Sequence, residues 1–108
     1  MLVNLRKGPL GSLDGPRSVL DLKRPPTSPR EMLLEEFLRP AGLTQVEAAR
    51  KMQIPLNRLN EIIRGRRRVS ADTALRLARL FKTSPEFWMG LQTDWDLWHA
   101  AQVQRKAG

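Results

Sequence analysis

The sequence predicts an all-α protein of five short helices preceded by an extended N-terminal arm. Three observations predict this fold: apolar residues recur at helical spacing from residue 28 onward, capping residues stand before the apolar runs, and no stretch alternates as a strand would. The 108 residues suit one domain with an appended arm. A hydrophobic content of 41% is enough for a small helical core.

The arm is predicted to span residues 1–27, and the folded domain residues 28–108. The arm holds three glycines and four prolines, a density of helix breakers that no helical period survives. Two interpretations of the arm stay open. It is a mobile tail, or its residues 18–22 form a short strand or pack onto a partner.

The first helix is predicted to begin at Ser28, because Pro29 suits the first helical position and Glu31 completes a capping box. Its apolar residues continue at helical spacing until Pro40 and Gly42. Both residue types interrupt a helix, so the first helix is expected to stop there.

The next two helices form a closely spaced pair. Thr44 and Glu47 make a second capping box at the start of one helix, and a tight turn at residues 53–55 follows it. The third helix covers about residues 55–64, and Gly65 is its expected stop.

Two further helices complete the domain. Ser70 begins the fourth helix, with Asp72 in the first turn, where the helix dipole favours an acidic side chain. The fifth helix begins at Ser84 and is expected to run to about Gln104.

The third helix has one apolar side and one polar side. At 100° per residue, Leu59, Ile62 and Ile63 share a side that must face the core. The other side and its flanks carry groups able to read base edges in a DNA major groove. These candidate DNA contacts are Leu56, Asn57, Arg58, Asn60, Glu61 and Arg64.

A strongly basic run, RGRRR at residues 64–68, leaves this helix. Arg64, Arg66, Arg67 and Arg68 are expected to contact the sugar-phosphate backbone and to add affinity without sequence preference. Gln45, in the first turn of the preceding helix, is expected to reach a phosphate. Each feature alone also suits an ordinary surface helix or a solvated loop. Together they have the layout of a helix-turn-helix reader of DNA.

Four residues of the fifth helix are spaced three, four and three apart, which places them on one stripe. They are Trp88, Leu91, Trp95 and Trp98. Two interpretations stay open: packing in the core, or a dimer seam, since tryptophan is enriched where interfaces bury their anchors. A two-fold dimer would place two reading helices about 34 Å apart, one turn of DNA.

Composition limits the remaining function classes. The formal net charge of +8 favours a polyanionic partner, nucleic acid first and an anionic membrane surface second. The absence of cysteine excludes disulfides and thiolate metal sites, and no apolar run approaches the roughly 20 residues that cross a bilayer. We therefore expect a cytoplasmic protein. The single histidine, His99, has no ligand or nucleophile set around it, so neither enzyme activity, nor a metal, nor a cofactor is expected.

Residues 44–65, TQVEAARKMQIPLNRLNEIIRG, resemble the helix-turn-helix of the lambda-repressor-like (XRE) family. Residues 24–40 and 74–81 resemble the HigA antitoxin group, as does SPEFWMGLQ at residues 84–92, whose FWMGLQ run is rather specific to that group. This resemblance implies a five-helix lambda-repressor-like domain. Among the candidate contacts, it implies DNA-contacting roles for Gln45, Leu56, Asn57, Glu61, Arg64 and Arg67.

The resemblance also implies a type II toxin–antitoxin system. The antitoxin would neutralise a RelE- or HigB-like, mRNA-cleaving toxin and, as a homodimer on a palindromic operator, repress its own operon. The sequence departs from the family in two places. Gln53 stands where the turn usually has glycine, and the arm before Arg24 is longer than is typical.

Two other functions stay open: a stand-alone XRE-type transcriptional regulator without a toxin, and a protein-interaction module whose basic face is incidental. For a toxin, the candidate surfaces are residues 19–22 and the outer face of the first helix. A strand from the arm could add to the edge of a toxin sheet.

Overall fold

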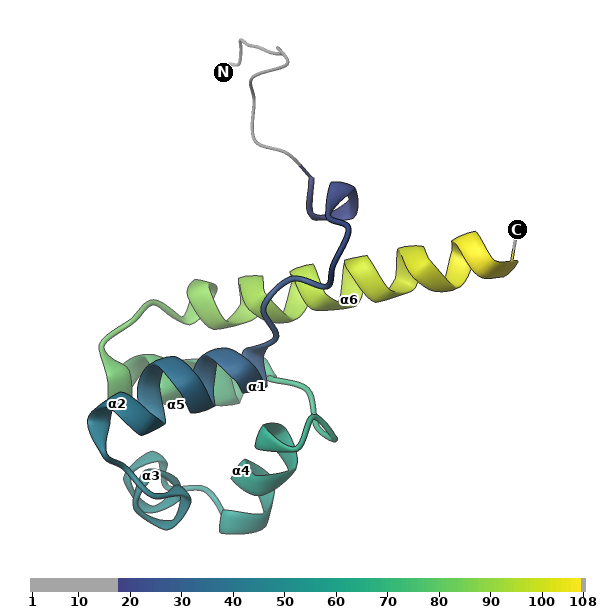
Figure 1. Cartoon of the computed structure of the whole chain (residues 1–108). Helices are drawn as coiled ribbons and strands as arrows, with labels where there is room; N and C mark the ends of the chain where they lie inside the picture. The colour runs from purple at the N-terminus through teal and green to yellow at the C-terminus, as the bar shows by residue number, and fades with distance from the viewer. Residues whose placement is uncertain (1–17, 108) are drawn as a thin grey trace, which may run out of the picture.

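The computed structural model describes residues 18–107, and all regular structure within that range is helical (Figure 1). The elements are the short 3-10 turn η1 (Val19–Asp21), α1 (Pro29–Glu31), the π-helical η2 (Met32–Leu38), α2 (Arg39–Ala41), α3 (Gln45–Met52), α4 (Leu56–Ile63), α5 (Ala71–Phe81) and α6 (Pro85–Ala107). The elements α1, η2 and α2 run on as one rod, so the five-helix, all-α prediction is confirmed. Residues 1–17 of the predicted arm lie outside the described residues.

The first rod begins and ends at two of the predicted residues. The Ser28 hydroxyl accepts a hydrogen bond from the Glu31 backbone N–H at 3.2 Å, and Gly42 ends the rod at φ +66°. Pro40, however, lies inside the rod and does not end it. Its ring has no N–H and would meet the carbonyl of Glu36 in a regular α-helix. The wider π-helical turns of η2 come directly before Pro40, where they relieve that conflict.

The turn between α3 and α4 has the conformation that usually requires glycine. Gln53 adopts a left-handed backbone, φ 59° and ψ 46°, which costs a non-glycine residue on the order of 1 kcal/mol. Arg76 of α5 supports this turn, since its Nη1 donates to the Met52 carbonyl at 2.8 Å and to the Gln53 carbonyl at 3.4 Å. Gln53 thus adopts the left-handed turn conformation itself, with Arg76 supporting the turn.

The core lies where the first rod, α3, α4, α5 and the start of α6 meet. Leu33, Leu59, Leu77 and Trp88 are among its fully buried side chains. The centroid of the Phe37 ring lies 5.1 Å from that of the Trp88 ring and 5.0 Å from that of the Phe81 ring, so an aromatic cluster joins the rod to α5 and α6.

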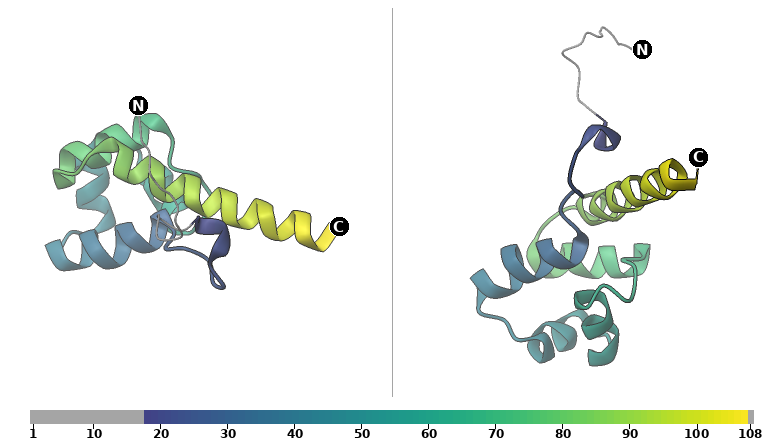
Figure 2. Two further views of the ribbon diagram at one scale, coloured as in Figure 1. Left: turned by 90° about the horizontal axis from the view of Figure 1, so that it is seen from above. Right: turned by 45° about the vertical axis from the view of Figure 1, so that its right-hand side comes forward.

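Helix α6 is much longer than the others, and its C-terminal half projects beyond the domain (Figures 1 and 2). The segment before α1 crosses this helix: Trp98 Nε1 donates to the Leu22 carbonyl at 3.0 Å, and Arg105 Nη2 to the Leu20 carbonyl at 3.4 Å. The strand considered for residues 18–22 is wrong. This segment forms the turn η1, whose N-cap Ser18 accepts from the Leu20 N–H at 3.1 Å.

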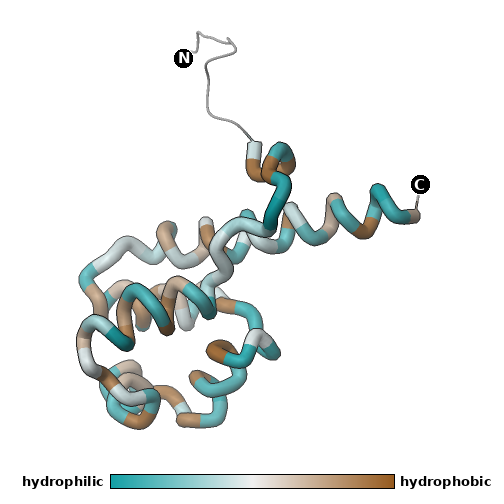
Figure 3. The backbone as a smooth tube through the Cα atoms, viewed as in Figure 1, coloured by the Kyte–Doolittle hydropathy of each residue, from teal (hydrophilic) through white to brown (hydrophobic). Residues whose placement is uncertain are grey.

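Hydrophobic residues are spread over every helix of the domain, and the projecting end of α6 alternates between hydrophilic and hydrophobic residues (Figure 3). Leu97 and Val103 are exposed on this half of α6, as are Leu20 and Leu22 of the crossing segment. Within residues 18–107, no helix is both long enough and apolar enough to cross a membrane.

Candidate nucleic-acid interface

Helix α4 has one side buried in the core and one open side that is exposed to solvent. Leu59, Ile62 and Ile63 are buried, as the periodicity predicts. Asn57 is exposed on the open side, and the Glu61 side chain retains 41% of its exposure. The protein's own atoms therefore leave these two polar groups accessible to a partner.

The starts of α3 and α4 are joined on this open side. Asn60 Nδ2 donates to Gln45 Oε1 at 3.1 Å, which fixes the two amides relative to each other. They line a shallow hollow together with Thr44, Val46, Leu56 and Asn57. Val46 was not among the predicted contacts, yet it is 59% exposed, and Leu56 is 45% exposed. The sequence feature that could have identified Val46 is its position: it is an apolar residue that does not lie on the buried side of α3.

Arg58 is turned away from the open side of α4 toward the start of α5. Its Nη2 donates to Asp72 Oδ2 at 2.5 Å and to Thr73 Oγ1 at 2.7 Å. The hydrogen bond from Arg58, and then that from Arg76, hold the pKa of the Asp72 carboxyl below its ordinary value. In this conformation Arg58 ties α4 to α5, and a contact with DNA would require the ion pair to open.

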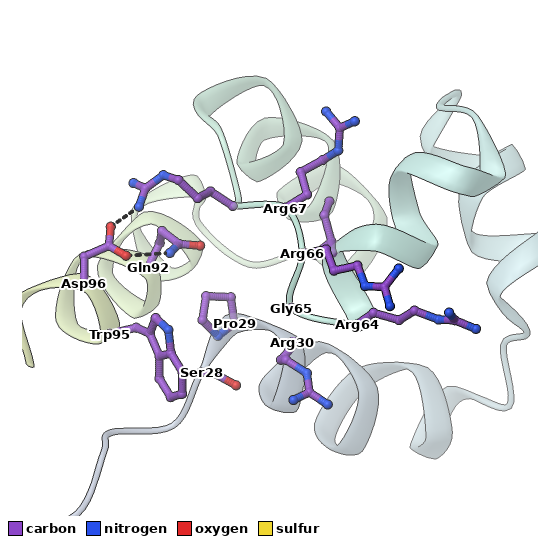
Figure 4. Close-up of a pocket in the computed structure, with 12 residues that line it drawn as sticks. Ser28, Pro29, Arg30, Arg64, Gly65, Arg66, Arg67, Gln92, Trp95 and Asp96 are labelled. Atoms are coloured by element: carbon purple, nitrogen blue, oxygen red, sulfur yellow. Dashed lines mark hydrogen bonds and ion pairs between the residues drawn. The ribbon is translucent and has the colours of Figure 1, made fainter. Parts of the chain in front are cut away.

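The basic run forms an exposed loop after α4, and its side chains have different neighbours. Arg64 and Arg66 point away from α6 (Figure 4). Arg67 pairs with Glu61 on α4, whose Oε1 accepts from Nε at 2.9 Å and from Nη2 at 2.7 Å. Arg68 turns the other way and pairs with Asp96 of α6.

Two residues outside the predicted set hold this loop in place. Arg30 Nε donates to the Ile63 carbonyl at 2.9 Å and so satisfies an orphan carbonyl at the end of α4. The buried Gln92 accepts the Val69 N–H at 2.9 Å. No sequence signal marked Arg30, because its partner is 33 residues away. For Gln92, the signal was a polar residue one helical turn after Trp88, beside the apolar stripe of α6.

Gly65 is where the chain leaves α4, at φ +75°, and its predicted role as the helix stop is met. A Cβ at this position would lie 3.1 Å from Cδ of Arg30. The glycine therefore allows both the left-handed backbone and the close approach of Arg30. The loop, Arg30, Gln92 and Trp95 line a hollow of about 320 Å³ (Figure 4).

The predicted aromatic stripe divides between core and surface. Trp88 has no exposed area, and its Nε1 donates to Thr83 Oγ1 at 2.7 Å. Its assignment to a dimer seam is wrong, because it is fully buried in the core of the domain, beside Phe37, Phe81 and Phe87. Leu91, Trp95 and Trp98 are half-buried. Trp95 packs on His99 with ring centroids 4.1 Å apart.

Within the described range, no three His, Asp or Glu side chains are grouped so that they could hold a metal ion. The site is a surface of polar and apolar side chains at the start of α4, bordered by exposed guanidinium groups.

Comparison with known proteins decides the family. A family model described as "Helix-turn-helix" matches residues 34–88, about half of the chain, from the first rod to the start of α6. The chain belongs to the XRE-type helix-turn-helix family. The predicted resemblance to this family and to HigA antitoxins is confirmed by the relatives described next.

Antitoxin HigA-1 of Vibrio cholerae is 40% identical to this XRE-type protein over 76 residues, 70% of this chain and 71% of the relative. An HTH-type transcriptional regulator of Haemophilus influenzae, described as uncharacterized, is 40% identical over 84 residues, 78% of each chain. Among solved structures, the Pseudomonas aeruginosa antitoxin HigA with the higBA promoter is 38% identical, with a TM-score of 0.73. That match covers 78% of this chain and 90% of the other.

Proposed function

We propose that this XRE-type protein binds duplex DNA with α4 in the major groove and acts as an antitoxin that represses its own operon. One observation carries the proposal. The side of α4 that bears Asn57 and Leu56 is open, while its other side is buried and its exit is an exposed arginine loop. A solved relative is described as an antitoxin with promoter DNA, which supports the same role here.

Sequence would be read at the start of α4, because the first residues of a recognition helix usually go deepest into the groove. Asn57 can make two hydrogen bonds with adenine, and the exposed methyl groups of Leu56 and Val46 suit contact with a thymine methyl. Gln45 would contact a phosphate from the first turn of α3, where the helix dipole favours an anion. Its bond with Asn60 holds this amide in place before DNA arrives.

The arginine loop would supply affinity. Arg64, Arg66 and Arg67 are exposed beside the open side of α4. A duplex that lies across this side would place its sugar-phosphate backbone next to these arginines. Each phosphate that an arginine neutralises releases counterions, so binding should weaken steeply as salt rises.

A homodimer would place two α4 helices on one palindromic operator. We assign the seam to the half-buried Trp95 and Trp98, which lie near the middle of α6 where its projecting C-terminal half begins. The two recognition helices would then meet the same face of DNA about 34 Å apart.

The toxin partner is proposed from the relatives named as antitoxins. A RelE- or HigB-like toxin would bind the outer face of the first rod. Glu31, Glu35 and Glu36 line a hollow there above Met32 and Phe37, which suits a basic protein. The alternative is a regulator without a toxin, which the Haemophilus influenzae relative favours by its description.

The test of DNA binding is a gel shift with the DNA upstream of the gene and a random duplex of equal length. We expect tighter binding to the upstream DNA and a steep loss of both complexes with salt. Equal binding of the two duplexes would contradict sequence-specific repression.

The test of the antitoxin role is co-expression with the small reading frame next to the gene, followed by affinity pull-down. We expect a stable complex and relief of toxicity. Charge reversal at Glu35 and Glu36 should weaken that complex without changing DNA binding. Sequence-specific DNA binding with no toxic neighbour would favour the stand-alone regulator.

A further inference from the structure

The arginine loop is attached to α6 by two residues that lie one helical turn apart. Gln92 Oε1 accepts the Val69 N–H at 2.9 Å, and Gln92 is only 6% exposed. Its Nε2 donates to Asp96 Oδ1 at 3.0 Å. The second oxygen of Asp96 accepts from Nη1 of Arg68. Gln92 thus fixes the backbone at the end of the loop, and it also fixes the carboxylate that pairs with Arg68.

This arrangement separates Arg68 from the other arginines of the loop. Arg64 and Arg66 point to the side opposite Asp96 and Gln92 (Figure 4). Arg67 pairs with Glu61, which lies on α4 itself and on its open side. Arg68 alone in this loop pairs with a carboxylate of α6.

We propose that Asp96 is a positioning residue that holds Arg68 away from the DNA backbone and thereby sets the nonspecific affinity of the protein. The inference rests on the proposed DNA binding. The pair is exposed, with 66% of Arg68 and 37% of Asp96 exposed, but Gln92 already holds the carboxylate in place, which lowers the side-chain entropy that such a pair normally costs. In the native DNA complex, Arg68 would stay paired with Asp96 and add no phosphate contact.

The variant that tests this is Asp96→Asn. Its remaining Oδ1 can still accept from Gln92, so the scaffold of the loop is preserved while the charge that attracts Arg68 is lost. Freed to neutralise one more phosphate, Arg68 should steepen the slope of log K against log salt by about 0.9. The additional phosphate contact also predicts roughly three- to tenfold tighter binding to any duplex near 0.1 M salt, with the preference for upstream DNA unchanged.

The matched control is Asp94→Asn. Asp94 is exposed on the same helix two residues earlier, so its loss adds the same unit of positive charge without touching the Arg68 pair. A general increase in attraction would appear in both variants. Only Asp96→Asn should steepen the salt slope by the amount expected for one additional phosphate contact.

The second control tests whether Arg68 carries the gain. Arg68→Gln should change the binding of the native protein little, and it should abolish the gain when combined with Asp96→Asn. Circular dichroism checks the fold, and Asp96→Ser serves as a second variant if the asparagine disturbs it.

Three results would overturn the inference: an Asp96→Asn protein that binds no tighter than Asp94→Asn, one that binds more weakly than native, or a gain that persists without Arg68. The failure of the proposed function is a separate result, since there the native protein would bind neither the random nor the upstream duplex. A native protein that binds normally, with no change in the variant, refutes the role of Asp96 alone.

Discussion

Asn57 is the residue on which sequence recognition is expected to depend most. Its amide is exposed on the open side of α4 and can pair with both hydrogen-bonding groups of an adenine edge. Asn57→Ala should lower the preference for upstream over random DNA by about 1–3 kcal/mol, as measured in gel shifts on both duplexes. The free energy of unfolding should change by less than about 0.5 kcal/mol, as for other surface positions.

Arg67→Ala is the matched contrast to that variant. It would remove the phosphate contact proposed for Arg67, so all duplexes should bind more weakly by a similar factor and the salt slope should fall by about 1. If Asn57→Ala weakened both duplexes equally while Arg67→Ala changed the preference, the two assigned roles would be reversed.

Gly65 is the residue whose replacement should disturb the loop most. Gly65→Ala strains the backbone at φ +75° and places a methyl group 3.1 Å from Cδ of Arg30. Gly42→Ala is the control, because its φ is +66° and nothing lies within 4 Å of the added Cβ. Urea unfolding should show a loss of about 1–2 kcal/mol at Gly42 and a larger loss at Gly65. Equal losses would mean that Arg30 moves aside freely.

At the scale of elements, the local sequence set most of the helix boundaries. Thr44 and Glu47 form the complete predicted capping box, and Ser70 caps α5 as expected. Caps depend on residues three positions apart, so they are visible in a sequence. Gly42 marked the end of the first rod, but Pro40 did not, because π-helical turns accommodate it within the rod.

The capping box of α3 should make stability depend on pH in the acidic range. The Thr44 N–H, and then its hydroxyl, donate to Glu47 and lower the pKa of that carboxyl below its ordinary value. The stabilisation is therefore present above the unfolded-state pKa and is lost as pH falls through the lower folded-state pKa. Thermal unfolding of Glu47→Gln should show a shallower loss of Tm on acidification. Part of the pH dependence of stability should remain in this variant, because the pKa of Asp72 is lowered too.

At the scale of the whole molecule, α6 links the folded domain to its projecting half, and we assign the dimer seam to Trp95 and Trp98, where the two meet. Trp95→Ala should give a more monomeric protein, measured by sedimentation, with weaker binding to a palindromic operator. Trp88→Ala is the contrast, because removing a fully buried ring should cost about 3–5 kcal/mol of folding free energy. Unchanged sedimentation of a folded Trp95→Ala protein would contradict the seam.

The parts of the site that escaped sequence analysis depend on contacts between distant residues. Arg30 meets Ile63, Gln92 meets Val69, and no spacing rule connects either pair. Arg58 has the right place on α4, but its neighbours on α5 decide where it points. Periodicity likewise aligned Trp88 with the rest of its stripe without showing that Phe37 and Phe81 cover it. The polar side of α4 was predictable because the helix repeat alone fixes it.

The contact between Trp98 and the Leu22 carbonyl has a practical consequence. The chain has no tyrosine, so its intrinsic fluorescence comes from three indole rings, of which only Trp88 is fully shielded from water. A soluble quencher such as iodide should therefore separate one protected emitter from two accessible ones. If the segment before α1 separates from α6 when a toxin or a second subunit binds, a change in the quenching of the two accessible tryptophans would report the movement without any added label.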